Sequence, residues 1–333
     1  MRVLVTGGGG FLGRALVTRL LGRGDQVRSL ARGAHKDLRA LGADVLRGDI
    51  GDAAAVSSAA RGCDAIVHVA ALVGSFGPYA TFYRTNVTGT ENVIAACRAH
   101  GIRKLVFTST PSVVHGGGDV AGVDESAPYA RSFEAHYPKT KAIAERLVLA
   151  ANDARLATVA LRPHLIFGPG DTQLLPRAVA QARAGKLRLP SGPAKLVDCT
   201  YVDNAVDAHV LALDRAEPGA ACAGRAYFIS NGEPLPMVDL VNRMLGAAGV
   251  PEVTARISPR LAYAAGVVAE VAHALLRRPG EPRITRFVAR QMMTAHWYDI
   301  GAAKRDLGYS PAVSIDEGLR RMKALLVAGE PLG

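Results

Sequence analysis

Short apolar runs alternate with longer segments of helical periodicity through the first half of the chain. The runs have the length of buried strands, whereas the segments at 14–21, 85–99 and 138–150 repeat their apolar residues at helical spacing. Strands that alternate with helices are typical of βαβ units and a parallel sheet. The strands expected from the apolar runs are residues 2–5, 26–30, 65–69, 104–107 and 157–161.

The pattern changes after Pro163, where turn-forming residues at 168–170 and 190–193 break the chain into shorter elements. We therefore expect a first domain of residues 1–165. Residues 166–333 are expected to complete the sheet and to form a smaller α/β lobe. The elements expected in this second segment are strands at 196–201 and 226–229 and helices at 174–184, 204–213 and 237–246.

The segment 259–276 is strongly apolar and is interrupted by Glu270 and His273. Its length predicts one helix. Three interpretations stay open: a helix packed into the lobe, a wall of an apolar substrate channel, and a contact with a membrane surface or another enzyme of the same pathway.

The first strand runs directly into a glycine-rich turn, and a helix pattern follows. Glycines let a backbone approach a pyrophosphate closely, and the N-terminus of a helix offers free N–H groups. The letters fit both Gly8-x-Gly10-x-x-Gly13 and Gly7-x-x-Gly10-x-x-Gly13. We expect a doubly wound sheet of the Rossmann type. Its dinucleotide site would include Gly7, Gly10, Phe11, Leu12 and Gly13.

The end of the second strand indicates which dinucleotide binds. An NAD site normally carries an acidic residue there, bonded to the ribose 2′-hydroxyl. This chain has Ala31 followed by Arg32, with His35 and Lys36 nearby. An arginine suits a 2′-phosphate, so we expect NADP(H). The alternative is that Arg32 is only a solvated loop residue.

A YxxxK motif, Tyr137 to Lys141, lies at the start of the 138–150 helix pattern. Pro138 suits the first turn of a helix, and residues four apart project to one side. A lysine near the tyrosine is expected to lower the pKa of the phenol, so that it can exchange a proton with an alcohol or ketone near neutral pH.

These motifs together resemble the extended short-chain dehydrogenases/reductases over nearly the whole chain. The resemblance implies that Asp49 and Ile50 flank the adenine and that Ala70 and Ala71 line the cofactor. It further implies cofactor contacts from Asn86, Lys141, Pro163 and Ile166, the last two beside the nicotinamide. The matching segments are residues 6–13, 48–50, 68–71, 86–92, 137–141, 162–163 and 167–171.

The family's third catalytic residue is a Ser or Thr after the strand at 104–107. Counting from Phe107 places Thr110 at this position, and Ser109 is the alternative. Either hydroxyl can donate to a carbonyl oxygen.

Within that superfamily, residues 108–114 and 296–311 resemble the 3β-hydroxysteroid dehydrogenase branch, whose members act on bulky lipids. Residues 108–114 are also similar to bacterial reductases of 2-alkyl-3-oxoalkanoates in olefin biosynthesis. The resemblance implies reduction of a long-chain 2-alkyl-3-oxo acid. The alternatives are a hydroxysteroid or sterol-4-carboxylate dehydrogenase, a nucleotide-sugar epimerase and a non-catalytic NADP sensor.

Composition and charge narrow the partners. The formal net charge is +11, but no run of five basic residues occurs, so we expect an anionic cofactor or acidic substrate and no nucleic acid. The four cysteines lack CxxC spacing, and no metal site is expected. The chain shows no signal peptide and no run of eighteen apolar residues, so a cytoplasmic protein is expected. We also expect a homodimer.

Overall fold

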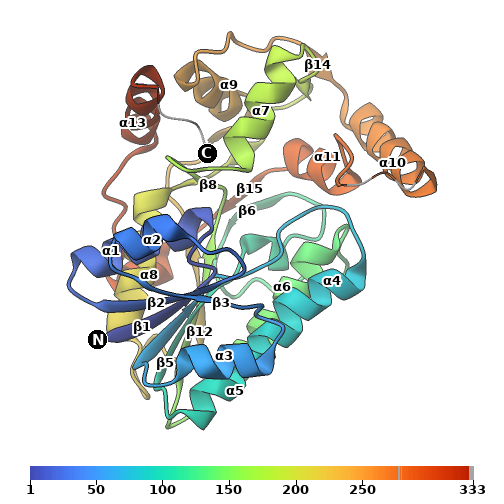
Figure 1. Ribbon diagram of the computed structural model, residues 1–333. Helices are drawn as coiled ribbons and strands as arrows, with labels where there is room; N and C mark the ends of the chain where they lie inside the picture. Colours follow the sequence, from blue (N-terminus) through green and yellow to red (C-terminus); the bar gives the residue numbers. More distant parts are fainter. Residues whose placement is uncertain (277, 279, 330–333) are drawn as a thin grey trace.

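A parallel seven-stranded sheet forms the centre of the molecule in the computed structural model, which describes residues 1–276, 278 and 280–329 (Figure 1). This confirms the predicted fold class and all five strands expected in the first half; β3 was not predicted. The strands, in spatial order, are β12 (Arg225–Ile229), β7 (Ala157–Pro163), β5 (Lys104–Thr108), β4 (Ala65–His68), β1 (Arg2–Thr6), β2 (Gln26–Ala31) and β3 (Asp44–Arg47).

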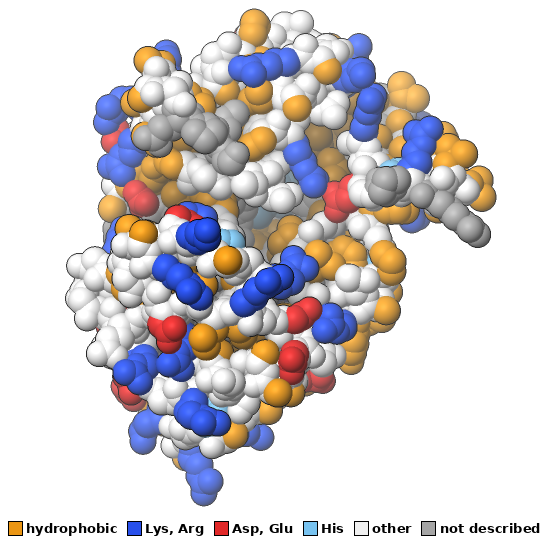
Figure 2. All heavy atoms as spheres, in the orientation of Figure 1, with side chains coloured by type: hydrophobic (Ala, Val, Ile, Leu, Met, Phe, Trp, Pro, Cys, Tyr) orange, Lys and Arg blue, Asp and Glu red, His pale blue; other side chains and the backbone are white. Residues whose placement is uncertain are grey.

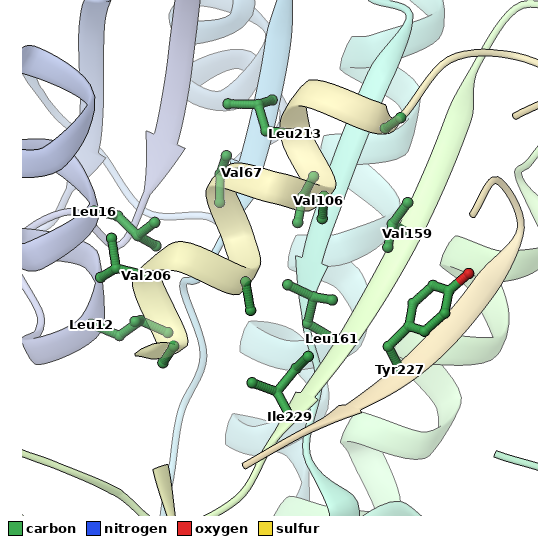
Figure 3. Packing of buried hydrophobic residues seen from close by; sticks show 14 of the residues in the cluster. Leu12, Leu16, Val67, Val106, Val159, Leu161, Val206, Leu213, Tyr227 and Ile229 are labelled. Carbon is green, nitrogen blue, oxygen red and sulfur yellow. The ribbon is translucent and has the colours of Figure 1, made fainter. Parts of the chain in front are cut away.

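Helices cover both faces of this sheet. One face carries α3 (Ala53–Ala60), α5 (Gly89–Ala99) and α6 (His136–Ala150). The other carries α1 (Phe11–Gly22), α2 (Lys36–Ala40), α8 (Val202–Arg215) and α12 (Gly301–Leu307). The cores are built mainly of Val, Leu and Ala, as the 5% aromatic content requires. Figure 3 shows the α1 and α8 side, where Leu12, Leu16, Val206 and Leu213 pack against Val67, Val106, Val159 and Leu161.

The lobe has its own core and a second, four-stranded sheet. Three helices, α7 (Leu174–Arg183), α9 (Met237–Ala247) and α13 (Ile315–Val327), enclose the lobe core. The lobe sheet has the order β13 (Leu235–Pro236), β10 (Leu196–Val197), β15 (His296–Tyr298) and β6 (Val120–Val123). Because β6 comes from the first half of the chain and β12 from the second, the chain passes between the two parts more than once. The boundary at residue 165 falls between β7 and β8 and stays a prediction.

The single strand predicted at 196–201 is wrong. The segment forms β10 in the lobe sheet and then β11 (Thr200–Tyr201), which pairs with β8 (Ile166–Phe167). The change of partner occurs at the buried Asp198, whose carboxylate accepts from the Tyr298 backbone N–H at 3.0 Å. A side chain that takes the place of a strand partner ends the pairing there.

Several short elements complete the fold. The helix expected at 85–99 begins with a π-turn at Arg84–Thr88 that follows α4 (Tyr79–Tyr83). Residues Pro111–Val113 form a 3₁₀ turn, and β9 (Leu189–Pro190) pairs with β14 (Arg256–Ile257). The helices α10 (Pro259–Leu275) and α11 (Arg286–Met293) form a hairpin at the side of the lobe (Figure 1). No helix in the described ranges combines the length and apolarity needed to cross a membrane.

Candidate active site

All strands of the parallel central sheet end at one edge, and many of the predicted site residues follow soon after β1, β2, β3, β4, β5 and β7. The strand order reverses between β1 and β4, and ligands of open parallel sheets bind outside the carboxyl ends of the strands at such a reversal. Figure 2 shows a hollow between this edge and the lobe, with hydrophobic and histidine side chains in it. This hollow is the candidate active site.

Gly7 and Gly13 are required by the tight turn into α1. Gly7 has a φ of +73°, and a Cβ there would lie 2.8 Å from the Ala70 Cα. A Cβ on Gly13 would lie 2.2 Å from the Gly7 carbonyl oxygen. Only glycine lets the loop, the helix and the end of β4 approach one another this closely.

Gly10 is different, because the protein's own packing does not require a glycine there. Its φ is −83°, and the nearest atom to an added Cβ would be 3.4 Å away. The open space beside Gly10 lies at the N-terminus of α1, where the N–H groups of Phe11 and Leu12 have no partner within the helix. This cradle fits the pyrophosphate of a dinucleotide.

Basic side chains surround the end of β2. Ala31 ends the strand and Arg32 is exposed beside it. His35 has a left-handed backbone with φ of 37°, and its ring lies so close to Gly9 that a Cβ there would be 2.0 Å from Cε1. Arg14 forms an ion pair with Asp37. No carboxylate takes the position that an NAD site uses, which fits a 2′-phosphate.

The residues expected at the adenine are held from the 86–92 segment. Asp49 accepts from the Gly51 N–H at 2.8 Å and pairs with Arg84 at 3.1 Å; these contacts, the backbone bond first, lower the pKa of its carboxyl. Asn92 donates to the Ile50 carbonyl at 3.0 Å. A Cβ on Gly89 would lie 2.8 Å from Ile50 Cγ2, so glycine makes room for Ile50.

A buried hydrogen-bond chain runs from β1 to α6 beneath the site. Thr6 Oγ1 bonds to His68 Nδ1 at 2.7 Å, and His68 Nε2 bonds to Thr90 Oγ1 at 3.0 Å. Thr90 donates to the Asn86 carbonyl, and Asn86 Nδ2 donates to Thr140 Oγ1 at 2.9 Å. Burial lowers the pKa of His68 to about 3, so its ring stays neutral.

Asn86 uses both ends of its amide within the protein. Its Oδ1 accepts from the Leu72 N–H at 2.7 Å, and Nδ2 also donates to the Leu72 carbonyl at 3.1 Å. The loop that follows Ala70 and Ala71 is thereby fixed against the helices. Asn86 holds this cofactor-side loop in place, whereas the sequence suggested a direct contact with the cofactor.

Tyr137 and Lys141 lie in the first turns of α6. Lys141 is 2% exposed, its Nζ donates to the Thr108 carbonyl at 2.6 Å, and it lies 3.9 Å from the centre of the Phe107 ring. Burial lowers the pKa of Lys141 to about 7, against a smaller opposite effect of Glu145. Glu145, one turn further on, is itself bound to Arg162 at 2.6 Å in a buried ion pair that the sequence did not indicate.

The expected lowering of the Tyr137 pKa is wrong for this arrangement. Burial raises the pKa of the phenol to about 12, and a side-chain hydrogen bond with Thr110 opposes the shift. The Lys141 ammonium donates to the Thr108 carbonyl, and burial sets the direction of the Tyr137 shift. A phenol with this pKa is protonated at neutral pH.

Thr110 is the better of the two candidate hydroxyls. It caps the 3₁₀ turn by accepting from the Ser112 N–H at 3.2 Å, and its side chain reaches Tyr137. Ser109 is 3% exposed, and its Oγ has no hydrogen-bond partner among the described residues. The side-chain contact with Tyr137 favours Thr110 over Ser109, and the choice between the two hydroxyls stays a prediction.

Three buried residues that sequence reasoning missed lie beside Pro163. His164 Nδ1 bonds to Asp198, and His164 Nε2 lies 3.1 Å from His296 Nδ1. His296 Nε2 lies 2.6 Å from the Gln291 carbonyl. All three side chains are at most 6% exposed. We call them the histidine–aspartate unit; it connects the end of β7 to the lobe sheet.

Hydrogen-bond geometry fixes the number of protons in the histidine–aspartate unit. The Gln291 carbonyl can only accept, so His296 Nε2 carries a hydrogen, and one more lies between His164 and Asp198. The two facing ring nitrogens need a third hydrogen between them. The unit thus holds one proton more than two neutral rings and a carboxylate. Burial and, after it, the charge of His164 lower the pKa of His296 to about 3, so the extra proton does not stay on the His296 ring.

Among the described residues, neither the cavity beside β12 nor a metal cluster adds a residue to the site. A cavity of about 310 Å³ beside β12, lined by Arg162, Tyr227 and Asp306 among others, contains none of the predicted catalytic residues. In the part of the chain that the structure describes, no cluster of three or more His, Cys, Asp or Glu side chains is arranged to hold a metal ion. All four cysteines are buried and free.

Known proteins are similar in sequence to this chain over nearly its full length. The sequence profile of the 3-beta hydroxysteroid dehydrogenase/isomerase family matches residues 4–258. A 2-alkyl-3-oxoalkanoate reductase of Stenotrophomonas maltophilia is 55% identical over 97% of this chain and 99% of its own. One of Shewanella oneidensis is 49% identical over 97% of this chain and 85% of its own. A 3-beta-hydroxysteroid dehydrogenase of Mycolicibacterium neoaurum is 33% identical over 96% of this chain and 89% of its own.

Solved structures show the same fold. The crystal structure of gox2253 matches with a TM-score of 0.77 and 26% identity over 98% of both chains. MoeE5 in complex with UDP-glucose and NAD matches with a TM-score of 0.74 and 25% identity over 99% of both chains.

Proposed function

The chain belongs to the 3-beta hydroxysteroid dehydrogenase/isomerase family of short-chain dehydrogenase-type oxidoreductases, and from this premise we propose that it reduces long-chain 2-alkyl-3-oxoalkanoates to 2-alkyl-3-hydroxyalkanoates with NADPH. The observation that carries the substrate class is the 55% identity, over nearly both full lengths, to a relative of that name. The proposal includes a role in olefin biosynthesis, which the resemblance of residues 108–114 implies.

Three side chains have the chemistry for the proposed reduction. When bound, the reduced nicotinamide supplies a hydride to the C3 carbonyl carbon. Tyr137 donates its phenolic proton to the carbonyl oxygen, and its pKa of about 12 keeps that proton available at neutral pH. Thr110 donates a hydrogen bond that strengthens as charge develops on the same oxygen. Lys141 is proposed to hold the nicotinamide ribose.

The cofactor site favours NADPH. The glycine cradle at Gly10 supports a pyrophosphate, and the basic residues after β2 support the 2′-phosphate. Ala31 stands where an acidic residue would repel this phosphate, and Arg32 follows it. We propose contacts with the rest of the cofactor from Asp49, Ile50, Ala70, Ala71, Pro163 and Ile166.

A hydroxysteroid dehydrogenase is the second candidate, because relatives of that name are 33–35% identical over most of the chain. Both substrate classes present an apolar body and an oxygen-bearing carbon to be oxidised or reduced. The two classes differ in the shape of the apolar body and in the carboxylate, which the alkanoate carries and the hydroxysteroid lacks.

A substrate panel in the oxidative direction tests the proposal. The 2-alkyl-3-hydroxy acid is offered with NADP⁺, because the keto acid can lose CO₂ on its own, and is compared with a 3β-hydroxysteroid and a UDP-sugar. Each buried methylene adds ~0.8 kcal/mol of binding, so kcat/KM should rise several-fold per carbon until the pocket is full. A higher kcat/KM on the steroid or sugar, or no dependence on chain length, would reject the proposed substrate.

A further inference from the structure

Exposed apolar side chains concentrate on one helix of the lobe. Among the described residues, twelve large apolar side chains are strongly exposed, and half of them lie in a short stretch that comprises α10 and the residue after it. They recur at helical spacing and so share one face. We call them the α10 outer face: Leu261 (61% exposed), Val267, Val268 (68%), Val271, Leu275 (77%) and Leu276.

The opposite side of α10 explains why this face points outward. Ala262, Gly266 and Glu270 are the buried positions of the helix. A Cβ on Gly266 would lie 2.8 Å from the Arg286 backbone nitrogen, so α10 and α11 are in close contact there. The Glu270 carboxylate accepts two hydrogen bonds from Arg286, one from its backbone N–H and one from its Nε, both at 2.7 Å. The hairpin is therefore held by its small and polar side, and its apolar side has no partner among the described residues.

Among the described residues of the hairpin that are next to the α10 outer face, the exposed charged side chains are arginines. Arg260, Arg278 and Arg283 are exposed. The two acidic residues of the hairpin are used internally: Glu270 pairs with Arg286, and Glu281 pairs with Arg177 at 3.0 Å. Figure 2 shows this projecting part of the lobe with orange and blue side chains side by side.

We propose that the α10 outer face lies in the surface of an anionic lipid bilayer, with its arginines at the lipid headgroups. An apolar stripe bordered by arginine is the composition that such surface helices use. With 17 residues, α10 lies along the surface and does not span it. A second copy is the poorer partner, because a symmetric dimer through this face would bring arginines of like charge together.

The end of α10 and the connection from α10 to α11 contact the loop at the mouth of the active site. Glu281 accepts from the Ser75 N–H at 2.9 Å, and the His273 and Phe76 rings pack edge to face at 5.3 Å. Ser75 and Phe76 belong to the loop after Ala70 and Ala71. A bilayer under α10 would therefore lie close to the entrance for an apolar substrate.

Vesicle flotation tests this proposal without any turnover. Phosphatidylcholine vesicles with and without phosphatidylglycerol are mixed with the full-length protein at low salt. The wild type should float with the anionic vesicles and be released by salt. The triple variant Val268→Asn, Val271→Asn, Leu275→Asn should lose ~10-fold or more of its bound fraction, since each lost apolar contact weakens binding. Arg260→Gln with Arg278→Gln should weaken binding to the anionic vesicles alone.

The matched control is Leu41→Asn with Val327→Asn, two residues that are also strongly exposed but lie outside the hairpin; its flotation should equal that of the wild type. The proposal is overturned if the wild type does not bind anionic vesicles, or if the triple variant binds like the wild type. A dimer, seen by light scattering, that the triple variant converts to a monomer would assign the face to a second copy instead.

Discussion

At the residue scale, one phenolic oxygen carries the proposed proton transfer. Tyr137→Phe removes the donor and keeps the ring, so kcat should fall by ~100- to 10,000-fold while the Kd for the cofactor stays nearly unchanged. Single-turnover kinetics and cofactor titration measure the two quantities. Tyr83→Phe alters an exposed tyrosine and should change neither. More than about a tenth of wild-type turnover in Tyr137→Phe would remove Tyr137 from the mechanism.

Arg32 should set the choice between NADPH and NADH. A charge-assisted phosphate contact contributes ~1.5–3 kcal/mol, so Arg32→Ala should cut the preference for NADPH by roughly 10- to 100-fold. The ratio of kcat/KM for the two cofactors is the quantity to measure. Arg103 is an exposed arginine just before β5, at the opposite ends of the strands from the candidate site. Arg103→Ala should leave the ratio unchanged. A wild-type preference for NADH would contradict the assignment.

Residues joined by local spacing could be found from the sequence, and residues joined only by the fold could not. Tyr137 and Lys141 are one helical turn apart, and the glycines lie in one turn. The histidine–aspartate unit draws on positions 34 and 132 residues apart in the chain, and no local spacing joins them. The sign of the Tyr137 shift was missed because the burial that raises the pKa of the phenol is a property of the folded site.

At the scale of elements, the 86–92 segment connects the loops on the cofactor side to α6. Asn86→Ala should lower the free energy of unfolding by ~1–3 kcal/mol, because buried partners lose their hydrogen bonds. It should also weaken cofactor binding, because the Leu72 loop is released. Urea unfolding and cofactor titration measure these effects.

A control separates the two effects of Asn86→Ala. Asn152 makes a similar bond, accepting from the Thr158 N–H at 3.1 Å, but at the edge of the sheet far from the site. Asn152→Ala should lower stability and leave the cofactor Kd unchanged. An unchanged Kd in Asn86→Ala would show that the Leu72 loop does not need this support.

The sequence predicted the large elements well and the lobe strands poorly. Apolar runs in the central sheet are buried on both faces, so they stand out from their surroundings. The lobe strands are two to four residues long, too short for periodicity to show. Their partners depend on contacts such as the one from Asp198 to Tyr298, which no local pattern encodes.

At the scale of the whole molecule, Lys141 makes stability depend on pH. Its pKa is about 7 when folded, against an ordinary value of 10.5. Between these values the unfolded chain binds the extra proton, so stability rises with pH. From about pH 7 to about pH 9, the wild type should gain ~2 kcal/mol relative to Lys141→Met. This gain is lost as the pH falls back through 7.

Urea unfolding of both proteins without added cofactor, at both pH values, measures this difference. Comparison with Lys141→Met removes the contributions of all other groups that titrate. Arg103→Ala should follow the wild type at both pH values. A difference that stays constant between them would mean that Lys141 keeps its charge in the folded protein.

The proton count of the histidine–aspartate unit restricts how these three positions can change over evolutionary time. Removing Asp198 alone leaves a buried positive charge without its partner, and removing His164 alone leaves a buried carboxylate. Either change lowers the free energy of unfolding by more than the intact pair contributes to it. The penalties are not additive, because a second replacement relieves the first. Viable descendants of this chain should therefore either keep all three residues or exchange them together for apolar ones, and chains with only one of them replaced should be rare.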